Sequence, residues 1–271
     1  MKRFRGLIAA SVFALAGALA DDKEKTSMEQ FQGIYGAAQW QEVFQDSGTA
    51  GWQEKWFLDG DTAKVENTPE GMVLTAGPDL KDNGDSMVLW TRESFAGDIL
   101  ISYDYTRLDE LTQNVCIIYI QATGKEEDPY TKDILEWASL RNRAQMPLYF
   151  RNMRVLHVSY AVDRHDQPGE YIRARQYPVA PGGNFNRDTE IKETYFNTGL
   201  FKPGVTYRLT FAKRAGKLYF RVQGDGQDRL FQWDLAGFPP VVEGRVGLRQ
   251  MPQRKSLYRD LRISVWREPG E

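Results

Sequence analysis

Residues 203–227, PGVTYRLTFAKRAGKLYFRVQGDGQ, decide the fold class of this chain. Apolar and polar residues alternate on both sides of a short break at Arg214, Ala215 and Gly216. Alternation with a period of two is the pattern of a half-buried strand, and two such runs around a glycine-containing break predict a β-hairpin. The apolar residues on its buried face are Tyr207, Leu209, Phe211, Leu218, Phe220 and Val222.

Strand-like runs of the same kind recur along most of the chain. Examples are SMVLWTRESF at residues 86–95, DILISYDYTR at 98–107 and RDLRISVW at 259–266. Turn-forming pieces such as NTPEG at 67–71 and GDG at 224–226 stand between the runs. Many short strands at this spacing predict an all-β sandwich or barrel.

One segment departs from the strand pattern. In PYTKDILEWASLRNRAQ, residues 129–145, the side chains of Ile134, Leu135 and Ala138 lie at helical offsets. We therefore expect a short helix or an insertion lying over the sheet near residues 130–145.

The N-terminal residues carry the pattern of a secretory signal peptide. A basic start, MKRFR, precedes an apolar run that closes on the small-residue pattern Ala18-Leu19-Ala20. We expect residues 1–20 to be removed and residues 21–271 to form a single domain of a secreted or periplasmic protein. No later run approaches the roughly 18 apolar residues of a membrane helix, so no membrane association is expected after cleavage.

Charge and cysteine content exclude several classes of protein. The 271 residues include 35 Lys and Arg and 37 Asp and Glu, and the net charge of -2 gives no electrostatic basis for binding nucleic acid. The single cysteine, Cys116, cannot form an internal disulfide, so a hydrophobic core must stabilise the fold.

We expect no cofactor and assign no metal ligands, because the sequence has no phosphate-binding loop and no histidine pair at zinc-binding spacing. Aspartates in predicted turns that leave room for a structural calcium ion are Asp59, Asp61 and Asp85.

Two neighbouring predicted strands carry an unusual set of polar residues. They are RVLHVSYAV at 154–162 and EYIRARQYP at 170–178, and the break between them contains Pro168 and Gly169. Alternate side chains of a strand face opposite ways, so the two polar faces coincide if the segments pair as a hairpin. The predicted shared face carries Tyr149, Arg151, His157, Ser159, Tyr171, Arg173, Arg175 and Tyr177. This face lines either a binding groove or a solvated surface.

Three stretches give the chain a resemblance to a known family. They are WQEVFQDSGTAGWQEKWFLDGDTAKVENTPEGMVLTAG at 40–77, MVLWTRESFAGDILISYDYTRLD at 87–109 and VVEGRVGLRQMPQRKSLYRDLRI at 241–263. With them, and with the strand around His157, the chain resembles the YesU-like bacterial family of unknown function within the concanavalin A-like lectin/glucanase superfamily. The resemblance implies a jelly-roll β-sandwich of two antiparallel sheets, one of them concave. It also implies a link to acidic or pectin-like glycans, and hence a polysaccharide or oligosaccharide partner.

The polar set has the chemistry needed to hold and cleave a uronate chain. An arginine guanidinium grips a carboxylate bidentately, and a tyrosine ring offers a flat face to a sugar. In β-elimination a base removes the proton next to the neutralised carboxylate, and an acid assists the departing oxygen. We predict a polysaccharide lyase with His157 as the base, because imidazole suits proton transfer near neutral pH, and with Tyr149 or Tyr177 as the acid. Substrate binding is predicted for Arg151, Arg173, Arg175, Tyr171 and Ser159.

Two other functions stay open at this point. A retaining glycoside hydrolase of the same fold needs two carboxylates about 5 Å apart, and the Glu-x-Asp-x-x-Glu pattern of jelly-roll glucanases is absent from the sequence. Carboxylates that could instead meet from different strands are Asp104, Asp109, Glu110 and Glu136.

A non-catalytic carbohydrate-binding protein would stack sugars on exposed aromatic rings. The candidate platforms are Trp90, Trp137, Trp233 and the tyrosines. The sequence sets neither the glycan nor the oligomeric state.

Overall fold

The computed structural model describes residues 27–111, 113–162 and 170–268. The chain divides into two compact units, Met1–Gln39 and Trp40–Glu271. In the first unit, residues 27–35 form a helix. The predicted signal peptide, residues 1–20, lies outside the described residues. Within the described ranges, no helix is long and apolar enough to cross a membrane.

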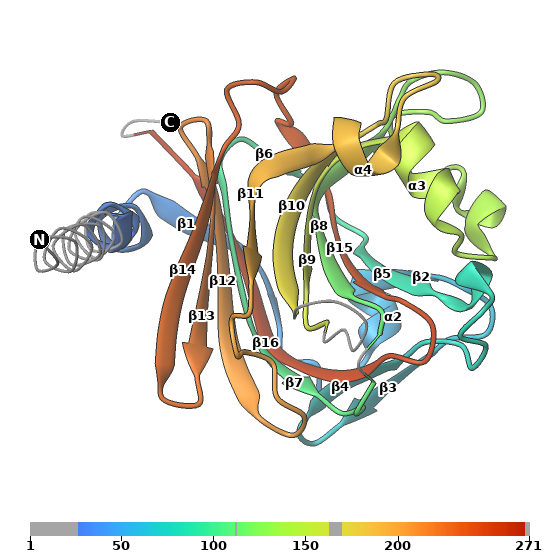
Figure 1. The fold of residues 1–271 in the computed structure, drawn as a ribbon, viewed down its shortest axis with the longest axis horizontal. Coiled ribbons are helices and arrows are strands. Elements are labelled where there is room, and N and C mark those ends of the chain that lie inside the picture. The colour runs from blue at the N-terminus through green and yellow to red at the C-terminus, as the bar shows by residue number, and fades with distance from the viewer. Residues whose placement is uncertain (1–26, 112, 163–169, 269–271) are drawn as a thin grey trace, which may run out of the picture. The chain divides into compact units, whose positions relative to one another are not determined.

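The second unit is a sandwich of two antiparallel sheets, each with eight strands in the described residues (Figure 1). The strands of the first sheet, in order across it, are β14 (Gln227–Asp234), β13 (Lys217–Gly224), β12 (Thr206–Arg214), β7 (Ile99–Arg107), β16 (Lys255–Trp266), β4 (Gly71–Thr75) and β3 (Lys64–Thr68), and β1 (Trp40–Asp46) also pairs with β16. The strands of the second sheet are β11 (Glu190–Phe196), β10 (Tyr171–Tyr177), β9 (Met153–Tyr160), β8 (Cys116–Gly124), β15 (Glu243–Gln250), β5 (Met87–Thr91) and β2 (Trp56–Asp59), and β6 (Phe95–Ala96) pairs with β15. The predicted all-β sandwich of two antiparallel sheets is confirmed.

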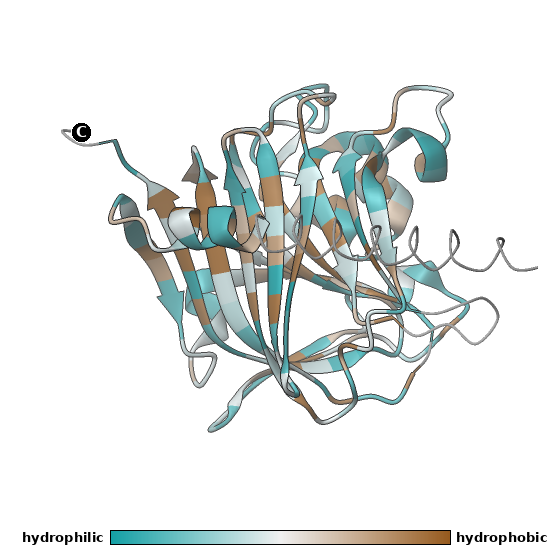
Figure 2. Ribbon diagram, turned by 60° about the vertical axis from the view of Figure 1, so that its left-hand side comes forward, coloured by the Kyte–Doolittle hydropathy of each residue, from teal (hydrophilic) through white to brown (hydrophobic). Residues whose placement is uncertain are grey.

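Short helical turns connect some of the strands. They are α2 (Trp52–Lys55), η1 (Asn83–Asp85), η2 (Ala138–Arg141), α3 (Met146–Asn152) and α4 (Phe185–Asp188). Figure 2 shows apolar and polar stretches alternating along the strands, which is the pattern of a sheet with two unlike faces.

The main hydrophobic core fills the space between the two sheets. The predicted hairpin is confirmed as β12 and β13, which stay in register from Arg208 to Arg214. Its predicted apolar face is buried, and the rings of Phe211 and Phe220 stack with centroids 4.1 Å apart. Burying a large apolar side chain contributes about 1.5–3 kcal/mol, which favours this face pointing inward. Cys116 is buried in the same core as a free thiol.

A smaller apolar cluster lies on the other face of the second sheet. Residues 125–152, here the cover segment, pack over part of that face. The rings of Trp90, Tyr119 and Tyr149 stack there, with centroids 5.3 Å apart for the first pair and 5.9 Å for Tyr119 and Tyr149. The insertion predicted near residues 130–145 is therefore confirmed as a cover over the sheet. Its helical part is the short turn η2, and α3 begins just after it.

Asp59, at the end of β2, ties the cover segment to the sheet. Its Oδ2 accepts hydrogen bonds from Arg141 Nε at 2.6 Å, Trp90 Nε1 at 2.7 Å and Tyr149 Oη at 3.1 Å. The guanidinium of Arg141 is wholly buried and lies 4.2 Å from the ring centroid of Trp137. Removing either partner of such a buried ion pair would leave an uncompensated charge, so the pair fixes where the cover segment sits.

Candidate functional site

Strands β9 and β10 place the predicted polar residues side by side. Arg173 lies opposite Ser159, and Arg175 lies opposite His157. The predicted pairing of the two strands is therefore confirmed, although the break at 163–169 lies outside the described residues. Residues opposite each other in an antiparallel pair point to the same face. The intervening residues of both strands belong to the main core, so this face points away from it.

These side chains line a pocket of about 540 Å³, here called the central pocket. Other parts of the chain complete it, among them the loop before β8, the start of α3, the start of α4 and the residue after β15. The lining consists of Gln113, Asn114, Val115, Ile117, Met146, His157, Ser159, Val162, Tyr171, Arg173, Arg175, Phe185, Asn186 and Met251.

His157 is almost wholly buried at the central pocket, with 2% of its surface exposed. Its Nδ1 lies 2.5 Å from the hydroxyl of Tyr177, and its buried Nε2 has no hydrogen-bond partner among the described residues. Burial, followed by the positive charges of three nearby arginines, holds the pKa of His157 well below its ordinary value. The arginines, in decreasing order of effect, are Arg175, Arg249 and Arg173. The imidazole is therefore neutral at physiological pH.

Tyr177 contacts His157 and does not itself line the central pocket. Its ring packs against Phe150, with centroids 6.4 Å apart. Burial raises the pKa of Tyr177 well above its ordinary value, so the phenol keeps its proton. The predicted direct contact of this hydroxyl with a substrate is not what the structure shows, because the hydroxyl lies against the imidazole. Tyr177 is placed to orient His157.

Uncharged acceptors hold the guanidinium of Arg175. Its Nη1 donates to the carbonyl oxygens of Phe185 and Asn186 at 3.0 and 3.1 Å, and to Thr189 Oγ1 at 3.0 Å. Its guanidinium carbon lies 4.5 Å from the ring centroid of Phe185. In the described part of the chain, no carboxylate forms an ion pair with Arg175. The charge of this arginine is therefore oriented but not neutralised.

Arg173 is less buried and lies beside an aromatic ring. Its Nε donates to Thr194 Oγ1 at 2.8 Å and lies 3.7 Å from Glu190 Oε1. Its guanidinium carbon is 4.5 Å from the ring centroid of Tyr171. Ser159, opposite Arg173, donates to the main-chain oxygen of that arginine at 3.3 Å. The structure thus brings together five of the eight predicted site residues in the lining of one pocket.

The central pocket is positively charged. Its described lining includes two arginines and no aspartate or glutamate. A third arginine, Arg249, is wholly buried close by, with its Nε 3.4 Å from the sulfur of Met251 and its Nη1 without a described partner. Water screens charge less well in a partly enclosed hollow, so this arrangement attracts anions. The planar fork of a guanidinium matches the geometry of a carboxylate or a phosphate.

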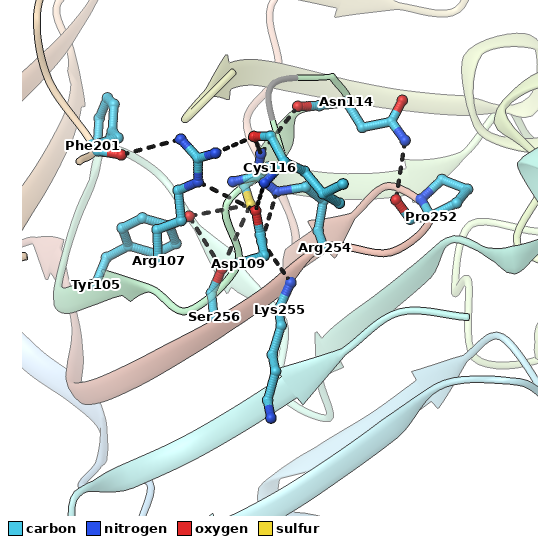
Figure 3. Close-up of polar contacts among 11 residues, drawn as sticks. Tyr105, Arg107, Asp109, Asn114, Cys116, Phe201, Pro252, Arg254, Lys255 and Ser256 are labelled. Atoms are coloured by element: carbon cyan, nitrogen blue, oxygen red, sulfur yellow. Dashed lines mark hydrogen bonds and ion pairs between the residues drawn. The ribbon is translucent and has the colours of Figure 1, made fainter. Parts of the chain in front are cut away.

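One wall of the central pocket rests on a buried polar cluster, shown in Figure 3. The carboxylate of Asp109 accepts a hydrogen bond from Arg107 Nε at 3.2 Å and lies 3.1 Å from Nε of the wholly buried Arg254. Arg254 Nη1 in turn approaches the carbonyl oxygen of Asn114 at 3.4 Å. Asn114 Nδ2 donates to the carbonyl oxygen of Pro252 at 3.0 Å. These contacts fix the loop that carries residues of the pocket lining.

Tyr149 and Arg151 do not extend the His157 strand, and that part of the prediction is wrong. Both lie on α3, whose first turn contains Pro147. Successive residues of a helix point about 100° apart, so the alternation of a strand does not apply to them. Tyr149 is buried and donates to Asp59, which rules out its predicted contact with a ligand in the central pocket. Arg151 is exposed and lines a second pocket.

The carboxylates considered for hydrolysis do not meet in the central pocket. Asp104 forms ion pairs with Arg208 and Arg259 on the first sheet. Asp109 belongs to the wall cluster, and Glu136 lines a separate pocket. A retaining hydrolase needs two carboxylates about 5 Å apart, and the described lining of the central pocket contains none.

The tryptophans considered as sugar platforms are buried. Trp90, Trp137 and Trp233 expose 0%, 3% and 2% of their surfaces, respectively. A buried ring cannot stack on a ligand, so the prediction is wrong for these three residues. The half-buried rings of Tyr171 and Phe185 line the central pocket in their place.

The aspartates considered for calcium have arginine partners. Asp59 is bound by Arg141 at 2.6 Å, and Asp61 and Asp85 lie 3.6 and 3.1 Å from Arg143. Among the residues that the structure describes, no group of three or more histidine, cysteine, aspartate or glutamate side chains is placed to hold a metal ion.

Comparison with known proteins gives one sequence relative of interest and several structural ones. No family model matches the chain. The uncharacterized protein YesU of Bacillus subtilis strain 168 is 25% identical over 190 residues, which cover 65% of this chain and 76% of YesU. A crystal structure of a protein of unknown function with a galectin-like fold, also from Bacillus subtilis, matches with a TM-score of 0.64 and 20% identity over 84% of this chain and 100% of that one.

Two lectins share the same architecture. The lectin UEA-II complexed with galactose matches with a TM-score of 0.53 and 12% identity, over 82% of this chain and 98% of the lectin. Basic winged bean lectin with Tn-antigen matches with a TM-score of 0.55 and 11% identity, over 83% of this chain and 98% of that one. At such identities the likeness concerns the fold alone. The chain is therefore similar in sequence to YesU and has a lectin-like β-sandwich fold, which agrees with the resemblance noted in its sequence.

Proposed function

We propose that this protein binds a carboxylate-bearing saccharide in the central pocket. One observation carries the proposal: Arg173 and Arg175 line a pocket whose described lining holds no aspartate or glutamate. Residues two apart on a strand project to the same side, so both guanidinium groups can reach one ligand. Each offers a planar fork of donors that matches a carboxylate. The ligand would supply the negative charge that the lining lacks.

The rest of the lining suits a sugar. The ring of Tyr171 lies next to the guanidinium of Arg173, and the ring of Phe185 lies next to that of Arg175, each at 4.5 Å. Each cation therefore has a flat apolar surface beside it, on which a sugar ring can rest. A few polar groups in an otherwise apolar hollow fix the orientation of a ligand. Such groups in this lining are Gln113, Asn114, Ser159 and Asn186.

The structural neighbours favour a saccharide over other anions. Both lectins with this sandwich are complexed with a sugar or a sugar antigen, galactose in one case and Tn-antigen in the other. Their likeness to this chain is one of fold, so the acidic character of the proposed ligand rests on the arginines of the central pocket.

A second candidate function is cleavage of the bound uronate by β-elimination. The observation that favours it is the neutral imidazole of His157 beside Arg175, because a neutral imidazole can accept a proton. Binding of the carboxylate by arginine makes the adjacent proton easier to remove. Tyr177 would orient the imidazole through Nδ1, and the proton taken up by His157 would pass to the departing C4 oxygen as the C4–C5 double bond forms. Hydrolysis by a carboxylate pair has no such support in the described lining.

Calorimetric titration tests the binding proposal. The ligands are galacturonate and glucuronate oligosaccharides, their methyl esters, and the matching neutral oligosaccharides of galactose and glucose. We expect the free acids to bind at least about tenfold more tightly than the esters, which corresponds to about 1.4 kcal/mol. Equal affinity for acids and esters, or no binding of any uronate, would overturn the proposal.

Ultraviolet absorbance of unsaturated uronate products tests the elimination proposal. Product formed by the wild type and lost in His157→Ala supports it, and no product from the wild type with any ligand of the panel refutes it.

We also propose that the protein is exported after cleavage at Ala20. N-terminal sequencing of the mature protein should then begin at Asp21, and an uncleaved chain confined to the cytoplasm would contradict export.

A further inference from the structure

A second pocket, of about 630 Å³, adjoins the central pocket. The two pockets share Phe185 in their linings. The second one, here called the distal pocket, is lined mainly by α3 and by the loop of residues 178–184 that joins β10 to α4. Phe185 therefore contacts both pockets and stands at their boundary.

Packing on several sides holds the ring of Phe185 at this boundary. Its centroid lies 4.7 Å from that of Phe150 and 6.0 Å from that of Tyr177, and the guanidinium carbon of Arg175 is 4.5 Å away. The side chain of Phe185 is nevertheless partly exposed. A ring that is fixed in the free protein loses little freedom when a ligand stacks on it. Phe185 thus offers a preformed stacking surface between the two pockets.

The main chain of the distal pocket is also fixed. The backbone nitrogen of Val179 donates to the carbonyl oxygen of Phe150 at 2.8 Å, which joins the loop to α3. The backbone nitrogen of Gly183 donates to the carbonyl oxygen of Ala180 at 2.8 Å. Asn184 caps α4, since its Oδ1 accepts from the Arg187 nitrogen at 3.1 Å. The hollow is therefore a built feature and not a gap under a loose loop.

The distal pocket carries excess positive charge. Its lining includes Lys125, Arg151 and Arg154 but only one acidic residue, Glu127. Lys125 pairs with Glu127 at 2.8 Å, and Arg154 pairs with Glu126. Arg151 forms no ion pair in the described part of the chain. One cation of this pocket is therefore left without a carboxylate, as in the central pocket.

We propose that the distal pocket binds a second uronate unit of the same saccharide chain. Phe185 lies between the two sugar positions, and Arg151 contacts the second carboxylate. This inference rests on the function proposed for the central pocket and specifies its ligand further. The preferred ligand is an acidic chain of two or more units, because a single sugar leaves Arg151 and the far side of Phe185 unused.

The dependence of affinity on chain length tests this inference. The full chain is titrated calorimetrically with galacturonate and with glucuronate, each as monomer, dimer, trimer and tetramer. The dimer or trimer should bind about tenfold more tightly than the monomer. Arg151→Gln should remove most of that gain and leave the affinity for the monomer unchanged. Arg187→Gln is the matched control, since Arg187 is an exposed arginine of α4 that pairs with Asp188 and lines neither pocket.

The failure of the inference differs from the failure of the proposed function. If neither monomers nor longer chains bind, the proposed function is wrong and the inference falls with it. If monomers bind and chain length leaves the affinity unchanged, only the inference about the distal pocket is wrong. The same conclusion follows if Arg151→Gln weakens binding of monomers and longer chains equally. Thermal unfolding of both variants should match the wild type, because both arginines are exposed.

Discussion

Replacing Arg173 by glutamine should weaken binding of an acidic saccharide by a predictable amount. In the proposed complex Arg173 donates to the ligand carboxylate, and a hydrogen bond to a charged group contributes about 1.5–3 kcal/mol. At about 1.4 kcal/mol for each factor of ten, the dissociation constant should rise about 10- to 150-fold. We expect the lower half of this range, because the side chain of Arg173 is 21% exposed and water screens part of the interaction.

The same substitution should leave the fold nearly unchanged. Arg173 lies 3.7 Å from Glu190, and both side chains are partly exposed. Exposed ion pairs contribute about 0–1 kcal/mol to stability. Glu190 also keeps the hydrogen bond that it accepts from Thr194 Oγ1 at 2.6 Å. The free energy of unfolding should therefore fall by no more than about 1 kcal/mol.

Calorimetric titration with galacturonate trimer, together with urea unfolding, separates the two effects. Arg208→Gln is the matched control: Arg208 also forms a partly exposed ion pair, with Asp104 at 3.2 Å, but it lies on β12 of the first sheet and outside the central pocket. The control should bind as the wild type does. Unchanged affinity in Arg173→Gln, or an equal loss in both variants, would refute the assignment of Arg173 to ligand binding.

The remaining predictions concern pH and buried charge. His157 has a folded pKa well below its unfolded value of about 6.5, so the unfolded chain gains the proton first and stability should fall as the pH drops below about 6.5. Urea unfolding of His157→Gln between about pH 7 and 5 should lack this part of the slope, and an unchanged slope would contradict it. Burial lowers the pKa of Lys213 to about 8, so the unfolded state holds more protons above that pH, and stability should rise between about pH 8 and 10.5. Lys213→Met should abolish this rise and unfold at higher urea than the wild type near neutral pH; a less stable variant would speak against a buried charge. Asp59→Ala leaves the guanidinium of Arg141 buried without its partner and should cost about 3–5 kcal/mol in the same assay, whereas a cost under about 1 kcal/mol would show that the pair does not hold the cover segment.

The strand pairs of this protein were predictable because their signals are local. The β12–β13 hairpin shows its alternation and its turn in one contiguous stretch. The same applies to β9 and β10, where alternation within each strand suffices to put His157 and Arg175 on one face. If either strand shifted its register by one residue, its polar side chains would point into the main core. Burial of the apolar residues that alternate with them therefore fixes the pairing of β9 with β10.

The error at α3 has an identifiable physical cause. Tyr149 and Phe150 are residue types that favour strands, so extending the alternation backward from the His157 strand places them on a sheet. Pro147 was the local signal against this reading, since proline suits the first turn of a helix and not a central strand. A helix this short is not stable alone. Contacts with the sheet fix it: Tyr149 stacks on Tyr119 of β8 and donates a hydrogen bond to Asp59.

The site residues that local patterns did not indicate come from distant parts of the chain. Arg249 reaches the neighbourhood of His157 only through the pairing of β15 with β8 and of β8 with β9. Phe185 arrives on the loop that follows β10. Gly247, on the same strand as Arg249, packs against Trp90 of β5, where an added Cβ would lie 2.5 Å from the ring. A glycine between apolar residues of a strand indicates such a close approach, although not its partner.

The buried arginines at and near the central pocket link the stability of the protein to its proposed function. Arg175 and Arg249 expose 4% and 0% of their surfaces, and neither contacts a carboxylate within the described residues. Burying an unpaired charge costs several kcal/mol, and well-packed apolar residues would give a more stable protein at both positions. In the proposed complex, the carboxylate of the ligand would supply the negative charge that these arginines lack. Burial, and after it the same cations that would attract an anion, lower the pKa of His157 and keep the imidazole neutral.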